Sequence, residues 1–189
     1  MIDYQYNIWG WMTHINKDQM LLPDPALFSG KDVLPKYKGN IAEVDWRAVE
    51  TIGQNPSSTP KRYGYAYDRL NRLTAGYYQN PNNPNSKENT ESLGYDLNGN
   101  ITSLYRTSVT EYGSTIPTKI DDLEYIYAVQ NKSNRLTNIH DFANNYTGYE
   151  GGGQEIKYDV NGNMTEMPDK GISKIRYNHL NLPDRKSVV

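Results

Sequence analysis

The sequence predicts an all-β protein in which antiparallel β-hairpins repeat side by side in a curved, spiralling sheet. The main observation behind this prediction is a phrase that recurs along the chain. It reads YDRLNRLT at 67–74, YDLNGNIT at 95–102 and YDVNGNMT at 158–165, with degenerate copies at 6–13, 127–137 and 177–181. Each copy places turn-forming residues between β-favouring Tyr, Ile, Leu and Thr. Recurrence of one short unit indicates a fold built from a repeated supersecondary structure.

The centre of the phrase predicts a three-residue hairpin loop. It begins with Asp68, Asp96 or Asp159, and Asp favours the first position of a type I turn. Its fourth position holds only Gly or Asn, which tolerate positive φ; these residues are Gly10, Gly39, Asn71, Gly99, Asn134, Gly162 and Asn181. A two-residue type I′ loop would also need positive φ at Leu70 and Leu180, which bulky side chains resist. A type I turn followed by one left-handed residue in a G1 bulge fits all copies.

This loop sets the register of each hairpin. It pairs an aromatic with an aliphatic residue across the two strands: Tyr6 with Met12, Tyr67 with Leu73, Tyr95 with Ile101, and Tyr158 with Met164. Tyr127 and Tyr177 hold the same place in their copies. Each such pair stabilises a sheet by about 0.2–1 kcal/mol. The Thr that follows in most copies is expected on the opposite face, and both faces carry apolar residues. Neighbouring hairpins must therefore stack.

The chain is expected to form a single repeat domain over 1–189. Strands are expected over 2–7, 11–17, 40–46, 63–68, 72–79, 92–96, 100–107, 122–128, 135–141, 154–159, 163–167 and 172–177. Polar loops are expected over 53–62, 79–92 and 143–155. The repeat is already in progress at both ends, so the chain is expected to be a fragment of a longer protein.

Composition narrows the classes of partner. Hydrophobic residues make up 36% of the chain, below the roughly 45–50% of ordinary soluble domains. The 17 Tyr, against 2 Phe, supply part of the missing apolar surface and favour sheet faces that are packed yet partly wet. The net charge is −2, with no basic stripe, so no nucleic-acid partner is expected. No stretch approaches the ~18 apolar residues of a membrane span, so no membrane insertion is expected.

The recurring phrase resembles the YD-repeat of the RHS family, which includes bacterial Rhs proteins, insecticidal toxin complexes and animal teneurins. The run YKGNI at 37–41 with Trp46-Arg47, following WGW at 9–11, further resembles RHS proteins of Bacteroidetes. The resemblance implies a spiralling β-shell that encapsulates and presents a C-terminal effector or toxin of the same polypeptide. It also implies a secreted or cell-surface location. The family's Asp-Pro-x-Gly autoproteolytic stretch has no counterpart at 182–185, so neither proteolysis nor toxicity is carried over.

Candidate catalytic and metal-binding residues are better explained by structure. Asp68, Asp96 and Asp159 each have a sufficient reason to exist as turn residues. The acidic cluster at 121–124 lacks the spacing and glycine of a calcium loop, and is expected to be a solvated strand start. The three His share no metal-ligand spacing and the chain has no Cys. Gly151 to Gly153 lack a following Gly-Lys-Ser/Thr and are expected to form a flexible loop. We expect no enzyme activity, no metal and no cofactor.

Two further expectations concern partners. Trp9, Trp11 and Trp46 are candidates for stacking on sugar rings, which would make the chain an extracellular adhesion or carbohydrate-binding module. The competing expectation is that these residues fill gaps between hairpins. The other partners expected are the remaining repeats of the same polypeptide, and a second copy in a homodimer formed through exposed sheet edges.

Overall fold

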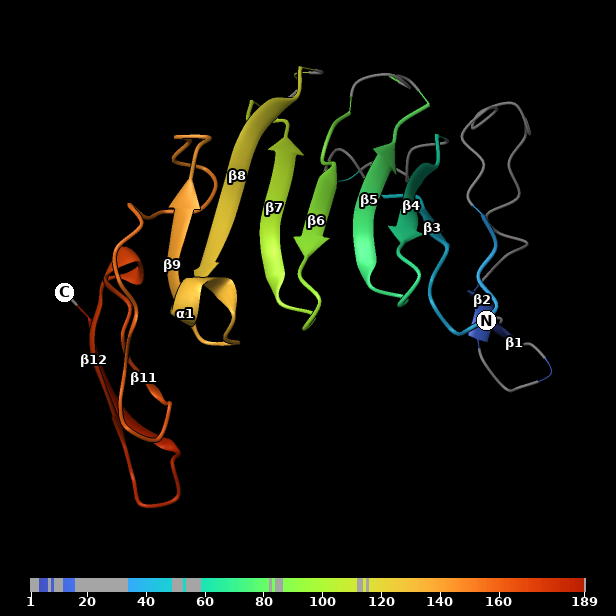
Figure 1. Ribbon diagram of the computed structural model, residues 1–189. Helices are drawn as coiled ribbons and strands as arrows, with labels where there is room; N and C mark the ends of the chain where they lie inside the picture. The colour runs from blue at the N-terminus through green and yellow to red at the C-terminus, as the bar shows by residue number, and fades with distance from the viewer. Residues whose placement is uncertain are drawn as a thin grey trace. The chain divides into compact units, whose positions relative to one another are not determined.

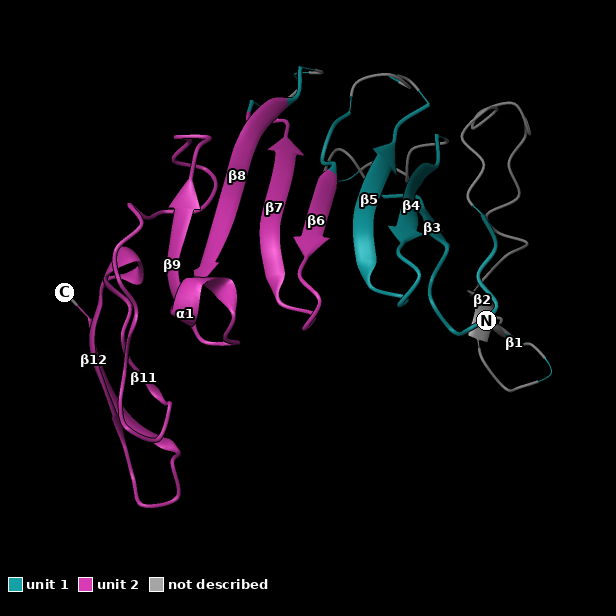
Figure 2. Cartoon of the chain, viewed as in Figure 1, with its two compact units in different colours: residues 1–90, 111–117 teal, residues 91–110, 118–189 magenta. Residues whose placement is uncertain are grey.

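The described residues form two compact units. The computed structural model describes residues 4–6, 8, 12–15, 34–48, 53, 59–81, 83, 87–111, 114 and 116–188. The first unit comprises residues 1–90 and 111–117, and the second comprises residues 91–110 and 118–189 (Figures 1 and 2). These residues are mostly β-structure in successive antiparallel hairpins, which confirms the prediction of an all-β protein built from repeated hairpins.

The first unit contains five strands in the part of the chain that the structure describes. Strand β1 (Tyr4–Tyr6) pairs antiparallel with β2 (Met12–Ile15). Strands β3 (Glu43–Trp46), β4 (Lys61–Tyr67) and β5 (Leu73–Gln79) pair in that order, also antiparallel. Ala75 of β5 is the buried hydrophobic side chain among the described residues of this unit.

The second unit contains eight strands among its described residues. Strands β6 (Glu91–Tyr95), β7 (Ile101–Ser108), β8 (Thr118–Tyr127) and β9 (Leu136–Asp141) pair in sequence order. Two more hairpins follow, β10 (Lys157–Tyr158) with β11 (Met164–Glu166) and β12 (Ile172–Tyr177) with β13 (Pro183–Val188). The 3₁₀ turn Pro168–Lys170 joins the last two hairpins. The buried hydrophobic side chains are Leu123, Tyr127, Ile139, Ile156 and Ile172.

The predicted turn is present in four hairpins. Asn71, Gly99, Gly162 and Asn181 have positive φ, between 57° and 91°. In each turn, the N–H of this residue donates to the carbonyl of the Asp or Asn three residues earlier. In the β10–β11 hairpin this bond joins Gly162 to Asp159 at 3.1 Å, and the Asp159 N–H donates to the Asn163 carbonyl at 2.9 Å. Gly39 also has positive φ, although no strand precedes it within 34–42. Gly10 lies outside the described residues.

The register of the hairpins is as predicted, but the strands contain a second irregularity. Tyr67 pairs with Leu73 as expected, yet Ala66 pairs with Ala75, which leaves Thr74 without a cross-strand partner. The same offset follows the aromatic pair in the other five hairpins, where the unpaired residues are Thr13, Thr102, Thr137, Thr165 and Asp184. The recurrent Thr is therefore a bulge residue, which bends the strand and increases its twist.

The connection between β8 and β9 differs from the prediction. Asn134 was expected to be the left-handed residue of a three-residue loop, but it has no positive φ. The left-handed residues are instead Val129, Gln130 and Asn131, in the short turn α1 (Ala128–Asn131). The longer loop is closed by the Ala128 N–H, which donates to the Arg135 carbonyl at 2.8 Å. The Tyr127–Leu136 pair is nevertheless kept.

Gly162 provides a test of the turn geometry. Replacing Gly162 with Ala is expected to lower the free energy of unfolding by about 1–2 kcal/mol, because an L-residue is strained at its φ of 85°. A Cβ at this position would meet no atom within 4 Å, so backbone strain alone sets this cost. Gly162→Asn is the matched control, since Asn occupies the equivalent place at 71 and 181. Urea denaturation that ranks Ala as no worse than Asn contradicts the assignment.

Candidate functional site

Both carboxylate oxygens of Asp68, Asp96 and Asp159 accept hydrogen bonds from donors in their own turns. In the β10–β11 hairpin, Oδ1 of Asp159 accepts the N–H groups of Asn161 and Asn163, both at 2.9 Å. Its Oδ2 accepts the Asn163 side-chain amide, also at 2.9 Å. Asp96 makes the matching contacts with Asn100, and Asp68 makes them with the N–H groups of Leu70 and Arg72 and with the Arg72 guanidinium. These contacts confirm the expected role as turn residues.

The hydrogen bonds explain how these carboxyls titrate. For Asp159, the side-chain and backbone donors of Asn163 lower its pKa, and they outweigh burial. For Asp68, the Arg72 N–H is the largest cause of a lowered pKa. For Asp96, burial opposes the shift, but the donors of Asn100, Asn98 and Gly99 together lower the pKa. All three groups are therefore held as carboxylates that accept bonds, the opposite of what a general acid needs.

The repeated tyrosines connect consecutive repeats. In four of them the hydroxyl donates to a backbone carbonyl at 2.7–2.8 Å: Tyr67 to Ile41, Tyr127 to Ile101, Tyr158 to Leu136, and Tyr177 to Met164. For Tyr127, Tyr158 and Tyr177 the acceptor is the residue that pairs with the tyrosine of the preceding hairpin. Burial raises the pKa of Tyr67, Tyr127 and Tyr158, so each of these hydroxyls keeps the proton it donates.

An asparagine link joins the turns themselves. The Asn100 amide donates to Asp96 in its own turn at 2.8 Å, and to Oδ1 of Asn134 in the next connection at 3.0 Å. The Asn163 amide divides its two hydrogens in the same way, between Asp159 and Oδ1 of Asn181. In the first unit, the Asn40 amide donates to the Asn71 carbonyl at 3.2 Å. Asn134 thus has a role between repeats, although its predicted backbone conformation was wrong.

Trp46 belongs to an aromatic cluster on β3, β4 and β5. Its ring stacks on Tyr63, with centroids 5.7 Å apart and planes 12° apart, and lies 5.9 Å from Tyr78. Tyr63 also stacks on Tyr65. All four rings are partly buried. This arrangement supports the expectation that Trp46 fills space between strands. Trp9 and Trp11 lie outside the described residues.

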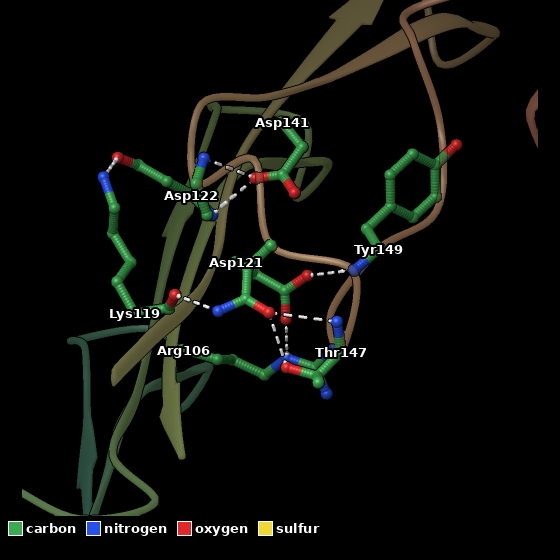
Figure 3. Close-up of polar contacts among 9 residues, drawn as sticks. Arg106, Lys119, Asp121, Asp122, Asp141, Thr147 and Tyr149 are labelled. Atoms are coloured by element: carbon green, nitrogen blue, oxygen red, sulfur yellow. Dashed lines mark hydrogen bonds and ion pairs between the residues drawn. The ribbon is translucent and has the colours of Figure 1, made fainter. Parts of the chain in front are cut away.

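The acidic cluster at 121–124 is only partly solvated: Glu124 is exposed as expected, but for Asp121 the expectation was wrong. Asp121 is fully buried within β8. Its Oδ1 accepts the Tyr149 N–H at 2.6 Å, and its Oδ2 accepts Nε of Arg106 on β7 at 2.5 Å (Figure 3). A buried charge is tolerated only when its partners are supplied by the fold. No local sequence pattern indicated this contact, because Arg106 and Tyr149 are both distant from Asp121 along the chain.

The loop after β9 is held against β8 by further polar contacts. Asn145 accepts the Thr147 N–H at 3.0 Å and donates its amide to the Lys119 carbonyl at 3.1 Å. Asp141 accepts the N–H groups of Asp122 and Ala143 (Figure 3). These bonds bring the loop backbone close to the strand. A Cβ added at Gly148 would overlap the carbonyl oxygen of Ile120.

The glycines at 151–153 surround a carboxylate. Asp169 accepts the N–H groups of Gly152, Gly153 and Gln154 at 3.0–3.2 Å, together with the Tyr149 hydroxyl at 3.2 Å. Burial, followed by the charge of Asp169 and this hydrogen bond, raises the pKa of Tyr149. The predicted loop is present, and its glycines have a structural use: they allow backbone N–H groups to converge on one side chain.

No catalytic constellation is formed by these residues. Among the residues that the structure describes, no group of three or more His, Asp or Glu is placed to hold a metal ion. No helix found within those residues is long and apolar enough to cross a membrane. Comparison of the chain with protein-family models finds no match, and neither does comparison with curated proteins.

Replacing Tyr127 with Phe tests the link between repeats. Loss of the hydroxyl removes one hydrogen bond to a backbone carbonyl, and is expected to lower the free energy of unfolding by about 0.5–1.5 kcal/mol. Tyr146, which is 89% exposed and outside the repeat phrase, provides the control Tyr146→Phe. Equal urea midpoints for the two variants would show that the hydroxyl makes no net contribution.

Acid is expected to weaken the turns. The folded pKa of each turn carboxylate lies below its unfolded value of about 4, so its contribution is present at neutral pH. This contribution begins to fall below pH about 4, and it is lost as pH falls through the lowered pKa of the folded state. The urea midpoint should therefore drop between pH 6 and pH 3. A variant with Asp68, Asp96 and Asp159 all changed to Asn should show a smaller drop; Asn178 already occupies this place in the last hairpin. An unchanged pH profile in the triple variant contradicts the assignment.

Gly148 tests the packing of the loop around Asp121. Gly148→Ala is expected to destabilise the protein by about 1–3 kcal/mol, because the new methyl group forces the loop away from β8. Gly152→Ala is the control, since a Cβ there meets nothing within 4 Å. In Gly148→Ala, hydrogen exchange should rise at the backbone amide of Tyr149, whose N–H donates to Asp121. Equal protection of that amide in both variants would contradict the expected effect.

Proposed function

We propose that this chain is a structural, non-enzymatic segment of an RHS/YD-repeat shell, which encapsulates and presents a C-terminal effector or toxin polypeptide. A secreted or cell-surface location belongs to the same proposal. The resemblance of the recurring phrase to the YD-repeat supplies the family. The contacts between consecutive repeats supply the physical reason for a structural role.

The observation that carries the proposal is the joint between consecutive repeats. At each joint described above, a tyrosine hydroxyl reaches back to the carbonyl of the preceding repeat. Where the turn carries an Asn after the left-handed residue, its amide reaches forward. Joints of this kind, which link one repeat to the next, suit a wall that grows by adding repeats.

The chemistry of the motif supports a non-enzymatic role. The conspicuous carboxylates are tied to the N–H and amide donors of their own turns. The tyrosine hydroxyls are tied to backbone carbonyls. A catalytic group must instead be free to meet a substrate or exchange a proton.

Protection of a C-terminal segment tests the proposal. The natural polypeptide that contains this chain is digested with proteinase K, alongside its segment C-terminal to the repeats expressed alone. The segment is expected to survive in the full polypeptide and to be degraded by itself. Equal rates of degradation, or a natural polypeptide with no segment beyond the repeats, would contradict the proposal.

A further inference from the structure

Tyr6 differs in exposure from the other tyrosines that begin a copy of the recurring phrase. It is 60% exposed. The other five are half-buried or buried, namely Tyr67, Tyr95, Tyr127, Tyr158 and Tyr177. The Tyr6–Met12 pair nevertheless has the same register as the aromatic pairs of the other hairpins. Tyr6 belongs to the first copy, so this chain holds no earlier repeat whose carbonyl could accept its hydroxyl.

The last hairpin, β12–β13, carries the matching acceptor. At the four joints, the accepting carbonyl belongs to the residue two places after the Gly or Asn of the turn motif, which is Ile41, Ile101, Leu136 or Met164. Pro183 holds this place after Asn181, and it pairs with Tyr177. Strand β13 is exposed over its whole length, whereas β7, β9 and β11, which each contain an accepting residue, are mostly half-buried or buried. Pro183 is therefore an acceptor position that no later repeat of this chain covers.

The residue directly after the turn Gly or Asn also contacts the following repeat. Asn100 and Asn163 donate to an Asn in the next connection. Arg135, in the same place, lies over the Tyr158 ring of the next hairpin, 5.7 Å from its centroid. Leu182 takes this place in the last hairpin and is 55% exposed. An aliphatic side chain packs well on an aromatic ring in a sheet, so Leu182 suits the tyrosine ring of a following repeat.

We propose that a second copy of this chain docks head to tail on the β12–β13 hairpin. The Tyr6 hydroxyl of one copy donates to the Pro183 carbonyl of the other, and Leu182 packs on the Tyr6 ring. This contact repeats the chemistry of the four joints within the chain. It does not require a continuous strand ladder, because Tyr177 joins β12 to β11 although these strands belong to separate sheets.

The proposed contact has a direction. The two copies contribute different surfaces, so the contact is heterologous, unlike that of a symmetric homodimer. Each pair retains one unused Tyr6 and one unused Pro183. Association therefore continues beyond the dimer, into an open chain of copies or a closed ring. The proposal uses the joint between repeats and needs no enclosed effector, so it can fail or succeed separately from the shell function.

Self-association of the full chain tests the proposal. Light scattering between about 10 μM and about 1 mM is expected to show a molar mass that rises with concentration and passes that of a dimer. Tyr6→Phe should weaken association about twofold to tenfold, because it removes one hydrogen bond and keeps the ring. Tyr146→Phe is the control, since Tyr146 is 89% exposed and outside the repeat phrase. A monomer throughout, or association that Tyr6→Phe leaves unchanged, overturns the proposal.

A mixing experiment tests the direction of the contact. Tyr6→Asp removes the donor and its ring, and Leu182→Asp places a carboxylate where the ring packs, so each variant alone should be monomeric. Their mixture should form dimers and nothing larger, because the intact Tyr6 of one variant meets the intact Pro183 of the other.

Val160→Asp is the control for Leu182→Asp, because Val160 is a fully exposed aliphatic residue of the same unit, and this variant should associate like the unchanged chain. Circular dichroism verifies that each variant is folded. Three results contradict the proposal: a mixture that stays monomeric, dimers in either single variant, or equal loss of association in Val160→Asp.

Discussion

The bond from a tyrosine hydroxyl to the carbonyl of the preceding repeat is the interaction on which the architecture depends. An isolated two-stranded hairpin is at best marginally stable in water. The β10–β11 hairpin is short, and both it and the β12–β13 hairpin are linked to the preceding repeat through this bond. Phe would supply the same apolar ring without the donor, which gives a reason for Tyr rather than Phe at this position of the repeat. The hydroxyl therefore links a hairpin to the one before it, which an isolated hairpin lacks.

The turn chemistry and the joint are coupled through one side chain. Asn163 closes its own turn through Asp159 and reaches the next turn through Asn181, using one amide nitrogen for both. Arg72, in the equivalent place, satisfies Asp68 instead. In both turns the Asp carboxylate accepts a hydrogen bond from the side chain four residues later, whether that is Arg or Asn. Of the two, only Asn also donates to the next turn. This difference separates what a repeat needs to fold from what it needs to join a neighbour.

Much of this arrangement follows from local rules that the sequence displays. The left-handed positions at Asn71, Gly99, Gly162 and Asn181 could be predicted because few residue types accept positive φ. The pairing of Tyr67 with Leu73 follows from the loop length. At Asn134 the same reasoning failed, because a longer connection moved the left-handed residues to Val129, Gln130 and Asn131. Composition matched the pattern there, but loop length decided the conformation.

Contacts between distant residues could not be predicted in this way. The burial of Asp121 depends on Arg106 and the Tyr149 backbone, neither of which a turn pattern reveals. The second bulge at Thr74 and its equivalents is also a property of paired strands rather than of one. The tyrosine hydroxyl bonds left a compositional trace in the excess of Tyr over Phe. That trace indicated a partly wet face, but it did not identify the acceptors.

The double use of the Asn100 and Asn163 amides has a consequence for producing this protein. Both residues head Asn-x-Thr acceptor sequences for N-linked glycans, at 100–102 and 163–165. A glycan takes one of the two amide hydrogens, and here both are engaged. Passage through a eukaryotic secretory pathway would attach sugar before these turns close and would separate adjacent repeats, whereas a host without that pathway leaves the joints intact.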